Sequence, residues 1–175
     1  ASLSLVAFVS FVSIVPSASA QPSDLVGVRA LGMAGAFTAV ADDSSATWWN
    51  PAGLATGAYF NAILEYDRPP GDAGDPVRAV SVAFPALGLS YYRLPLSEIR
   101  ASASTAAGVG SRQDEGVLGV YGATIGQSIG NHLVIGSTVK LARGGDTKTG
   151  LDVGAMAAFG RARIGLMVRN AREIE

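Results

Sequence analysis

The residues of this chain that could perform acid–base or metal chemistry are few and scattered. Asp42 and Asp43 are adjacent carboxylates, a pair that can hold a metal ion or share a proton. His132 is the only histidine and lies far from them in the sequence. Adjacent acids without a nearby histidine or a second carboxylate cluster more often cap a helix or stabilise a turn, so we expect a structural role for both.

Other sequence features also point away from catalysis. The chain contains no P-loop, H-E-x-x-H or dinucleotide-binding motif. It has no cysteine, which excludes disulfides, thiolate metal sites and cysteine nucleophiles. His132 begins an expected strand beside a turn, which favours an interfacial position over a catalytic role. We therefore expect no enzymatic activity, no metal site and no cofactor.

The composition is typical of a lipid-facing β-sheet. Charged residues make up 15% of the chain, against roughly 25% in soluble domains. Glycine accounts for 22 of the 175 residues, well above its usual share of about 7%. The formal net charge of -1 offers no bulk attraction for nucleic acid, so we expect no nucleic-acid partner.

The first twenty residues have the pattern of a secretory signal peptide. An apolar stretch from Leu3 to Val15 precedes Ala18-Ser19-Ala20, an A-x-A cleavage site before Gln21. A transmembrane anchor is the alternative, but the stretch is shorter than the roughly 20 apolar residues that a span needs. We expect a cleaved signal at residues 1–20. Because an initiator methionine and a basic n-region are missing, we also expect the chain to be cut at its N-terminus.

Residues 21–57 are rich in glycine and alanine and differ from the rest of the chain. We expect part of this segment to be a short helix ending at Asp42-Asp43, although Gly32 and Gly35 weaken its helix propensity. The segment closes with Asn50-Pro51-Ala52-Gly53, where proline fixes its own φ and biases the preceding residue toward extended conformations. We expect a rigid turn there, with an ordinary loop as the alternative.

Seven segments after residue 57 alternate apolar with small or polar side chains, as a strand with two different faces does. In the sixth, Leu151 and Val153 alternate with Asp152 and Gly154. Several segments approach the roughly 9–11 residues that cross a bilayer at a tilt. The expected strands are residues 58–67, 77–84, 87–94, 116–127, 132–143, 151–159 and 162–169.

The connections between these segments alternate between long and short. The first, third and fifth are long, the fifth running from Gly144 to Gly150, and the other three are tight turns. Outer-membrane barrels have short periplasmic turns and long extracellular loops, whereas a soluble β-sandwich, the alternative, does not require this pattern. Together with the signal peptide, the alternation predicts an all-β antiparallel transmembrane barrel in a bacterial outer membrane. Residues 58–175 would form its wall, with the lipid bilayer as partner.

Seven strands cannot close a bacterial single-chain barrel, whose strand number is even. An open sheet leaves a bare hydrogen-bonding edge that lipid cannot satisfy. We therefore expect these strands to be part of a larger barrel. Inside it, Lys140, Arg163 and Arg169 are candidate luminal charges that could pair with Asp42 or Asp43.

The stretch from Arg29 to Leu54 resembles the N-terminal signature of the FadL-like outer-membrane protein superfamily. It reads R-A-L-G-M-A-G-A-F-T-A-V-A-D-D-S-S-A-T-W-W-N-P-A-G-L. The likeness is closest to the PorV/PorQ-type and TraF-like uncharacterised branches, which often carry R-x-L-G-M-G-G-A-F followed by A-D-D and N-P-A-G-L. Ala34 departs from the glycine of many members. The motif positions are Arg29, Gly32, Gly35, Asp42, Asp43, Asn50, Pro51, Ala52 and Gly53, and weaker likenesses follow at residues 135–140, 151–154 and 165–170.

The resemblance implies a barrel of about fourteen strands, of which the seven expected here would be roughly half, with about seven more elsewhere in the protein. It also implies that the N-terminal segment folds into the lumen as a plug. It implies passive transport of hydrophobic small molecules such as fatty acids. Small residues such as Gly136, Gly154 and Gly165 would leave room for the ligand when the plug shifts. PorV-type members instead escort secreted proteins to the cell surface. A structural or escort role in secretion, with secreted proteins as partners, is therefore the second hypothesis, and a soluble exported β-domain with a hydrolytic site is the third.

Overall fold

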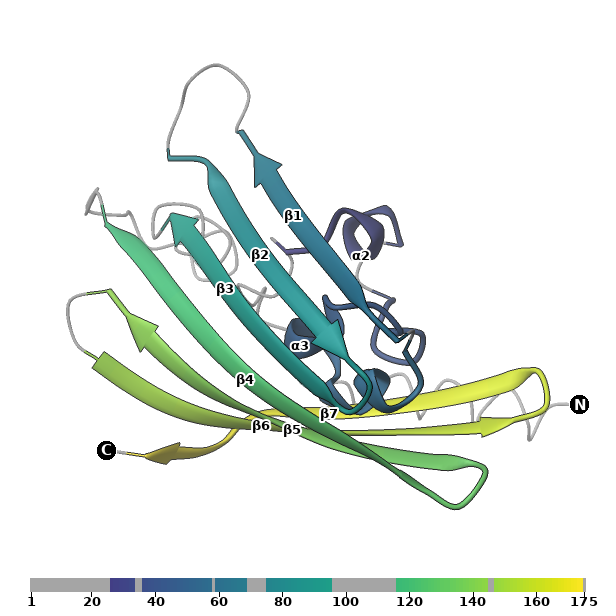
Figure 1. Cartoon of the computed structure of the whole chain (residues 1–175). Coiled ribbons are helices and arrows are strands. Elements are labelled where there is room, and N and C mark those ends of the chain that lie inside the picture. Colours follow the sequence, from purple (N-terminus) through teal and green to yellow (C-terminus); the bar gives the residue numbers. More distant parts are fainter. Residues whose placement is uncertain are drawn as a thin grey trace, which may run out of the picture.

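The computed structural model describes residues 26–33, 36–57, 59–68, 75–95, 116–144 and 147–174 of the chain. Its main element is a seven-stranded antiparallel sheet in which each strand pairs with its neighbours in the sequence (Figure 1). The signal peptide expected at residues 1–20 and the motif residue Gly35 lie outside the described residues. The strands are β1 (Asn61–Asp67), β2 (Val77–Phe84), β3 (Leu87–Pro95), β4 (Val117–Ile129), β5 (Leu133–Arg143), β6 (Thr147–Phe159) and β7 (Ala162–Ile174).

The expected all-β antiparallel fold is confirmed, and each alternating segment contains a strand. The fifth connection differs from the prediction. It comprises residues 144–146 and does not extend to Gly150, because β6 begins at Thr147, which pairs with Arg143 at the end of β5. Threonine is β-branched and suits an extended backbone, so the ladder continues through a stretch whose glycine and charge suggested a loop. The expected alternation of long and short connections is therefore wrong at its fifth position.

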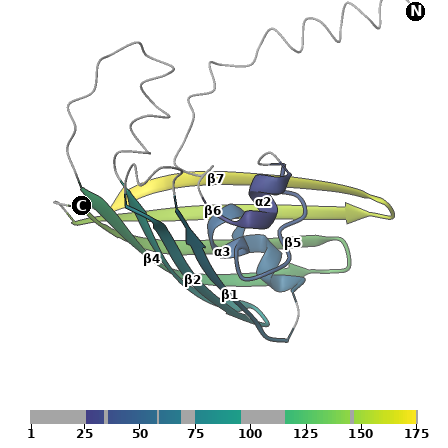
Figure 2. The same ribbon diagram turned by 90° about the horizontal axis from the view of Figure 1, so that it is seen from above.

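The sheet is curved (Figure 2), and its two faces carry different residues. In β2, Ala79 and Ser81 are buried on the concave face, whereas Val80 and Phe84 on the convex face are 43% and 49% exposed. The strands β1 and β7 form the two edges of the sheet, and among the described residues they do not pair with each other. The sheet is therefore open, with one buried and one exposed face.

The segment before the sheet lies against the concave face (Figure 2). It contains α2 (Val28–Gly32), α3 (Ala46–Trp49) and the 3-10 helix η2 (Pro51–Ala55), and η2 contacts β4, β5 and β6. We call its described residues, 26–33 and 36–57, the plug segment. None of the helices in the described part of the chain is long and apolar enough to cross a membrane.

The helix of the plug segment is shorter than expected. It ends at Gly32 and does not reach Asp42-Asp43, because the N–H of Met33 closes a tight turn by donating to the Ala30 carbonyl oxygen at 3.1 Å. Residues 36–40 form turns. Gly32 is exposed, and an added Cβ would meet nothing within 4 Å, so no close contact requires glycine there. Its low helix propensity is consistent with the end of α2 at this position.

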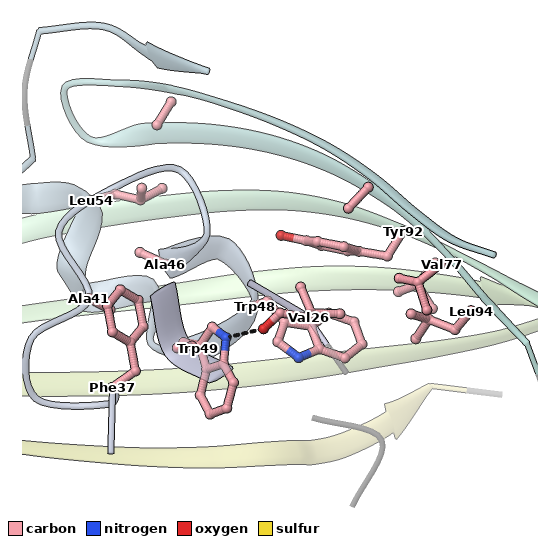
Figure 3. Packing of buried hydrophobic residues seen from close by; sticks show 14 residues of the cluster. Val26, Phe37, Ala41, Ala46, Trp48, Trp49, Leu54, Val77, Tyr92 and Leu94 are labelled. Carbon is pink, nitrogen blue, oxygen red and sulfur yellow. Dashed lines mark hydrogen bonds between the residues drawn. The ribbon is translucent and has the colours of Figure 1, made fainter. Parts of the chain in front are cut away.

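The two tryptophans pack the plug segment, Trp49 against residues of the same segment and Trp48 against the sheet (Figure 3). The indole N–H of Trp49 donates to the Val26 carbonyl oxygen at 2.8 Å, and its ring meets Phe37 edge-on with centroids 6.2 Å apart. Trp48 packs on Tyr92 of β3 at a centroid distance of 4.8 Å. Both tryptophans are buried. Because each buried aromatic side chain removes about 150–250 Å² from water, the contact between Trp48 and Tyr92 contributes to the attachment of the plug segment, and the Trp49 contacts hold the segment itself together.

Candidate functional site

Glycines on the concave face let the backbone of the plug segment touch the sheet. Gly126, Gly136, Gly154 and Gly165 lie in the successive strands β4 to β7, and we call these four the glycine seat. A Cβ at Gly136 would lie 2.4 Å from the carbonyl carbon and oxygen of Pro51. Contacts this short leave no space for a side chain, so the fit of the plug segment depends on glycine there.

The glycine seat is filled by the plug segment in this structure. A Cβ at Gly154 would come within 2.0 Å of the Asn50 side-chain oxygen, and one at Gly165 within 2.5 Å of the Thr38 carbonyl oxygen. With the plug segment seated, Gly136, Gly154 and Gly165 leave no room for a ligand, and the expectation that they do so when the plug shifts stays a prediction. The absence of their side chains accommodates backbone and buried amide groups of the protein itself.

Gly136→Ala is expected to weaken the docking of the plug segment. The added methyl group would overlap the backbone carbonyl of Pro51, and overpacking of this kind costs about 1–3 kcal/mol. Both tryptophans of the chain lie in the plug segment, so the denaturant midpoint of their fluorescence change should fall. Gly119→Ala is the matched control, because its Cβ would lie at an ordinary 3.6 Å from Tyr91. Equal shifts in the two variants would contradict the role of the seat.

Asn50 fastens the plug segment at the centre of the seat. Its fully buried side chain donates from Nδ2 to the Thr38 carbonyl oxygen at 2.8 Å, and longer contacts reach the carbonyl oxygens of Ala155 and Leu166 at 3.3 and 3.5 Å. Its Oδ1 accepts the Ala52 N–H at 3.1 Å, which closes the turn into η2. A neutral amide carries both donors and an acceptor, so it satisfies the carbonyl oxygens around Nδ2 and the backbone N–H at Oδ1 at the same time.

The remaining motif residues shape the same turn. Pro51 is the first residue of η2, where its missing N–H loses no helical hydrogen bond. A Cβ on Gly53 would lie 1.9 Å from the Ala41 carbonyl oxygen, and Ala52 is fully buried. The motif thus forms a tight buried turn. Its 3-10 helix packs on β4, β5 and β6.

Asp42 and Asp43 bind a cation of their own segment. Arg29 Nη1 lies 2.6 Å from Asp42 Oδ1 and 3.0 Å from Asp43 Oδ2. The hydrogen bond to Asp42, followed by that to Asp43, raises the pKa of Arg29 above its ordinary value. Asp43 also accepts the Ser45 N–H at 2.9 Å, in the turn role that we expected. The expected pairing with the luminal charges of the sheet is wrong, because Arg29 lies within reach from α2.

The three candidate luminal charges have three different surroundings. Lys140 Nζ pairs with Asp152 Oδ2 at 2.8 Å. The guanidinium carbon of Arg169 lies 5.6 Å from the centre of the Trp48 ring, and its Nη2 donates to the Trp48 carbonyl oxygen at 3.2 Å. Arg163, beside the turn between β6 and β7, makes no ion pair with any described residue. Two of these cations therefore hold the sheet or the plug segment, and the third does not.

The carboxylate of Asp152 binds Lys140 and also stabilises an irregularity in the sheet. The register between β6 and β7 shifts at Leu151 and Val153. Asn170 on the opposite strand has a φ of 50°, in the left-handed region that asparagine tolerates better than most residues. Its N–H donates to Asp152 Oδ1 at 2.9 Å. One buried carboxylate thus binds both the bulge and the lysine.

Asp152→Asn is expected to remove the ion pair while retaining an acceptor for the bulge. We expect a loss of about 1–2 kcal/mol in the free energy of unfolding, because the partly exposed Lys140 can turn toward water. Lys140→Met in the Asp152→Asn background should recover much of this loss, since it removes the unpaired cation. A double-mutant cycle from denaturant unfolding measures the coupling. Strictly additive effects would show that the pair is not coupled.

Several polar residues that position the plug segment were not singled out from the sequence. Glu65 in β1 accepts the Gly27 N–H with both carboxylate oxygens, at 3.1 and 2.9 Å. The hydroxyl of Tyr92 bonds with that of Thr47 at 2.9 Å, and Thr138 donates to the Thr47 carbonyl oxygen at 3.3 Å. Their position in the alternating pattern could have indicated this role, because a polar side chain on the buried face of a strand requires a hydrogen-bond partner.

A hydrolase-like spacing was also missed. Residues 126–130, Gly-Gln-Ser-Ile-Gly, match G-x-S-x-G, a motif that places a nucleophilic serine on a strand-to-helix turn. Here the motif runs from the end of β4 into the turn toward β5, an antiparallel hairpin. The ring of His132 in that turn meets Phe159 edge-on at 5.7 Å. The local structure therefore lacks the context that makes this spacing a nucleophile elbow.

Comparison with known proteins gives no match to the chain among family models, curated proteins or solved structures. Within the described ranges, no three histidine, aspartate or glutamate side chains come together as metal ligands. What the described residues build is a docking site between the plug segment and the concave face. Its chemistry consists of close backbone packing on glycine, buried hydrogen bonds and aromatic contacts.

Proposed function

We propose that the chain forms wall and plug of an outer-membrane β-barrel that passes hydrophobic small molecules, such as fatty acids, across the membrane. The observation that carries the proposal is the convex face of the sheet, where every strand exposes large apolar side chains. Monomeric soluble proteins rarely expose contiguous apolar patches beyond a few hundred Å². The exposed residues are Leu64, Tyr66, Val80, Phe84, Leu87, Leu89, Tyr121, Ile125, Ile129, Leu133, Ile135, Val139, Val153, Phe159, Ile164, Leu166 and Val168.

The strand register supports a continuous apolar surface. Leu89 lies opposite Val82 on one side and Ala123 on the other. Ala123 in turn lies opposite Val139, which faces Leu151 in the next strand. This row crosses five strands without a polar side chain. Water would surround these side chains at a cost, whereas lipid tails would stabilise them.

Aromatic and cationic side chains border the apolar face at the ends of the strands away from the tight turns. Arg78 lies opposite both Tyr66 and Arg93. One step closer to the middle, Tyr91 and Tyr121 face each other with ring centroids 4.8 Å apart. Tyrosine is enriched at membrane–water interfaces, and arginine extends from there toward water. The order from apolar residues to tyrosine to arginine therefore supports a membrane boundary.

Strand length supports the same proposal. β5 has 11 residues, which at about 3.4 Å per residue and a tilt of about 45° rise by about 26 Å. The apolar band of outer-membrane barrels is about 25 Å tall. The unpaired edges of β1 and β7 would be untenable in lipid. We therefore include in the proposal further strands that pair with these edges and complete a barrel of about fourteen.

The plug segment gives the proposed passage its gate. The pocket beside it at the turn end has a volume of about 150 Å³, below the roughly 300 Å³ at which pockets for drug-sized ligands begin, and is therefore too small for a long-chain fatty acid. A hydrophobic ligand would therefore pass only when the plug segment shifts within the lumen. The glycine seat, Asn50 and the tryptophan contacts would set how readily it does so.

Membrane fractionation with heat-modifiable gel migration tests the barrel. We expect the protein in the outer-membrane fraction, a need for detergent, and a mobility change on heating. A mature protein that stays soluble without detergent would contradict the barrel. Uptake of a fluorescent fatty acid into vesicles containing the purified protein tests transport separately. Insertion without uptake above that of empty vesicles would contradict transport alone and favour the escort role in secretion.

A further inference from the structure

A pocket opens at the turn end of the concave face, between the plug segment and the hairpin turns. Its volume is about 150 Å³, and we call it the turn-end pocket. Thr56 of the plug segment forms one wall, Asn131 and His132 of the turn between β4 and β5 form another, and Met156 and Arg163 complete it from β6 and β7. The pocket thus lies where the plug segment ends against the sheet.

The charges of the turn-end pocket favour an anion. Arg163 lines it, and none of its described lining residues is a carboxylate. Lys140 is neutralised by Asp152, whereas Arg163 makes no ion pair with any described residue. The guanidinium group is a planar fork of donors that matches a carboxylate. Asn131 adds an N–H group that can donate to the same ligand. The Thr56 hydroxyl already donates to the Gly53 carbonyl oxygen at 3.0 Å, and its oxygen can still accept a hydrogen bond.

The size and the apolar wall of the pocket limit the rest of the ligand. Its volume of about 150 Å³ has room for about five water-sized groups. Leu133, Val134 and Met156 supply an apolar surface beside the polar groups. A small organic acid with a short alkyl chain satisfies both parts of the lining, whereas an inorganic anion would leave the apolar wall without contact.

We propose that the turn-end pocket binds short-chain carboxylates such as butyrate. The carboxylate lies on Arg163, and the alkyl chain packs against Met156. The pocket is formed by the sheet and the plug segment alone. The proposal therefore holds whether or not the protein transports hydrophobic molecules, and binding can be measured on the purified protein without a transport assay.

Titration calorimetry of the full chain in an uncharged detergent, in a carboxylate-free buffer, tests the proposal. We expect butyrate to bind with a dissociation constant on the order of millimolar, as a ligand of so few atoms should. Butyramide, its neutral analogue, should bind at least about tenfold more weakly than butyrate. Arg163→Gln should weaken butyrate binding about tenfold. Arg161→Gln, at the neighbouring turn, is the matched control and should leave the binding unchanged.

Methyl NMR localises the ligand, because the three methionines of the chain are Met33, Met156 and Met167. Butyrate should shift the Met156 methyl resonance and leave the other two in place. Arg163→Lys keeps the charge without the fork and should bind with intermediate affinity, and it replaces Arg163→Gln if that variant fails to fold. Equal binding of butyramide, equal losses in the Arg161 and Arg163 variants, or an unshifted Met156 would each overturn the proposal.

Discussion

Asn50→Asp is expected to release the plug segment from the sheet while the strands stay paired. The amide of Asn50 is fully buried and donates to the Thr38 carbonyl oxygen at 2.8 Å, with two further carbonyl oxygens at 3.3 and 3.5 Å. An ionised carboxylate has no proton to donate and would face three oxygens instead. An uncompensated buried charge costs about 3–5 kcal/mol.

The two tryptophans make this release measurable. Trp48 and Trp49 of the plug segment are both buried, and the guanidinium of Arg169 in β7 lies 5.6 and 5.7 Å from their ring centres. Their emission should therefore shift to the red on release, while the far-UV signal of the strands remains. Trypsin should also gain access to Arg29. Asn50→Ala loses only hydrogen bonds and should cost about 1–3 kcal/mol, and Asn131→Asp in an exposed turn should change neither signal. An Asn50→Asp protein with unshifted emission would contradict the role assigned to the amide.

Leu89→Arg is expected to reduce the amount of folded protein in the outer membrane. Leu89 is 63% exposed on the convex face, between Val82 and Ala123. If that face meets lipid, an arginine near the bilayer midplane costs about 2–4 kcal/mol. If the face meets water, the same change replaces an exposed apolar side chain with a soluble one and costs little. The variant therefore distinguishes the two environments of the sheet.

Folding into lipid vesicles, followed by heat-modifiable migration, measures this effect. Asn131→Arg adds the same charge at a tight turn, where the proposed barrel meets the interface and the cost should be about 0–1 kcal/mol. The ratio of folded to unfolded protein should fall for Leu89→Arg and stay near the original value for Asn131→Arg. Equal yields of the two variants would place the convex face in water and remove the main support for a barrel.

The strands could be predicted from the sequence because their signal is local. Side chains alternate across a strand by geometry, so the alternation of Leu151 and Val153 with Asp152 and Gly154 revealed both the strand and its two faces. The loop expected up to Gly150 shows the limit of this approach. Glycine and charge weaken a strand when considered alone, but the paired end of β5 stabilised the extended backbone from Thr147 onward.

Partners were harder to predict than strands. Asp42 and Asp43 were expected to meet cations of the sheet, but Arg29 lies closer because α2 ends at Gly32 and the chain then turns back. The partner of the buried Glu65 was equally hard to predict. Its carboxylate binds a backbone N–H of the plug segment at 2.9 Å, a contact that depends on how the plug segment crosses the face of β1 and on nothing local to the strand.

The sequence by itself determined the seven antiparallel strands of the described part of the chain, each with one apolar and one small or polar face, because the direction of each side chain follows from the backbone of its own strand. Only the tertiary structure showed that the face of small and polar residues packs against the plug segment. Only the curvature of the sheet brings Gly136 and Gly154 against Pro51 and Asn50, because contacts between residues so far apart in the chain depend on the paths of both segments in space.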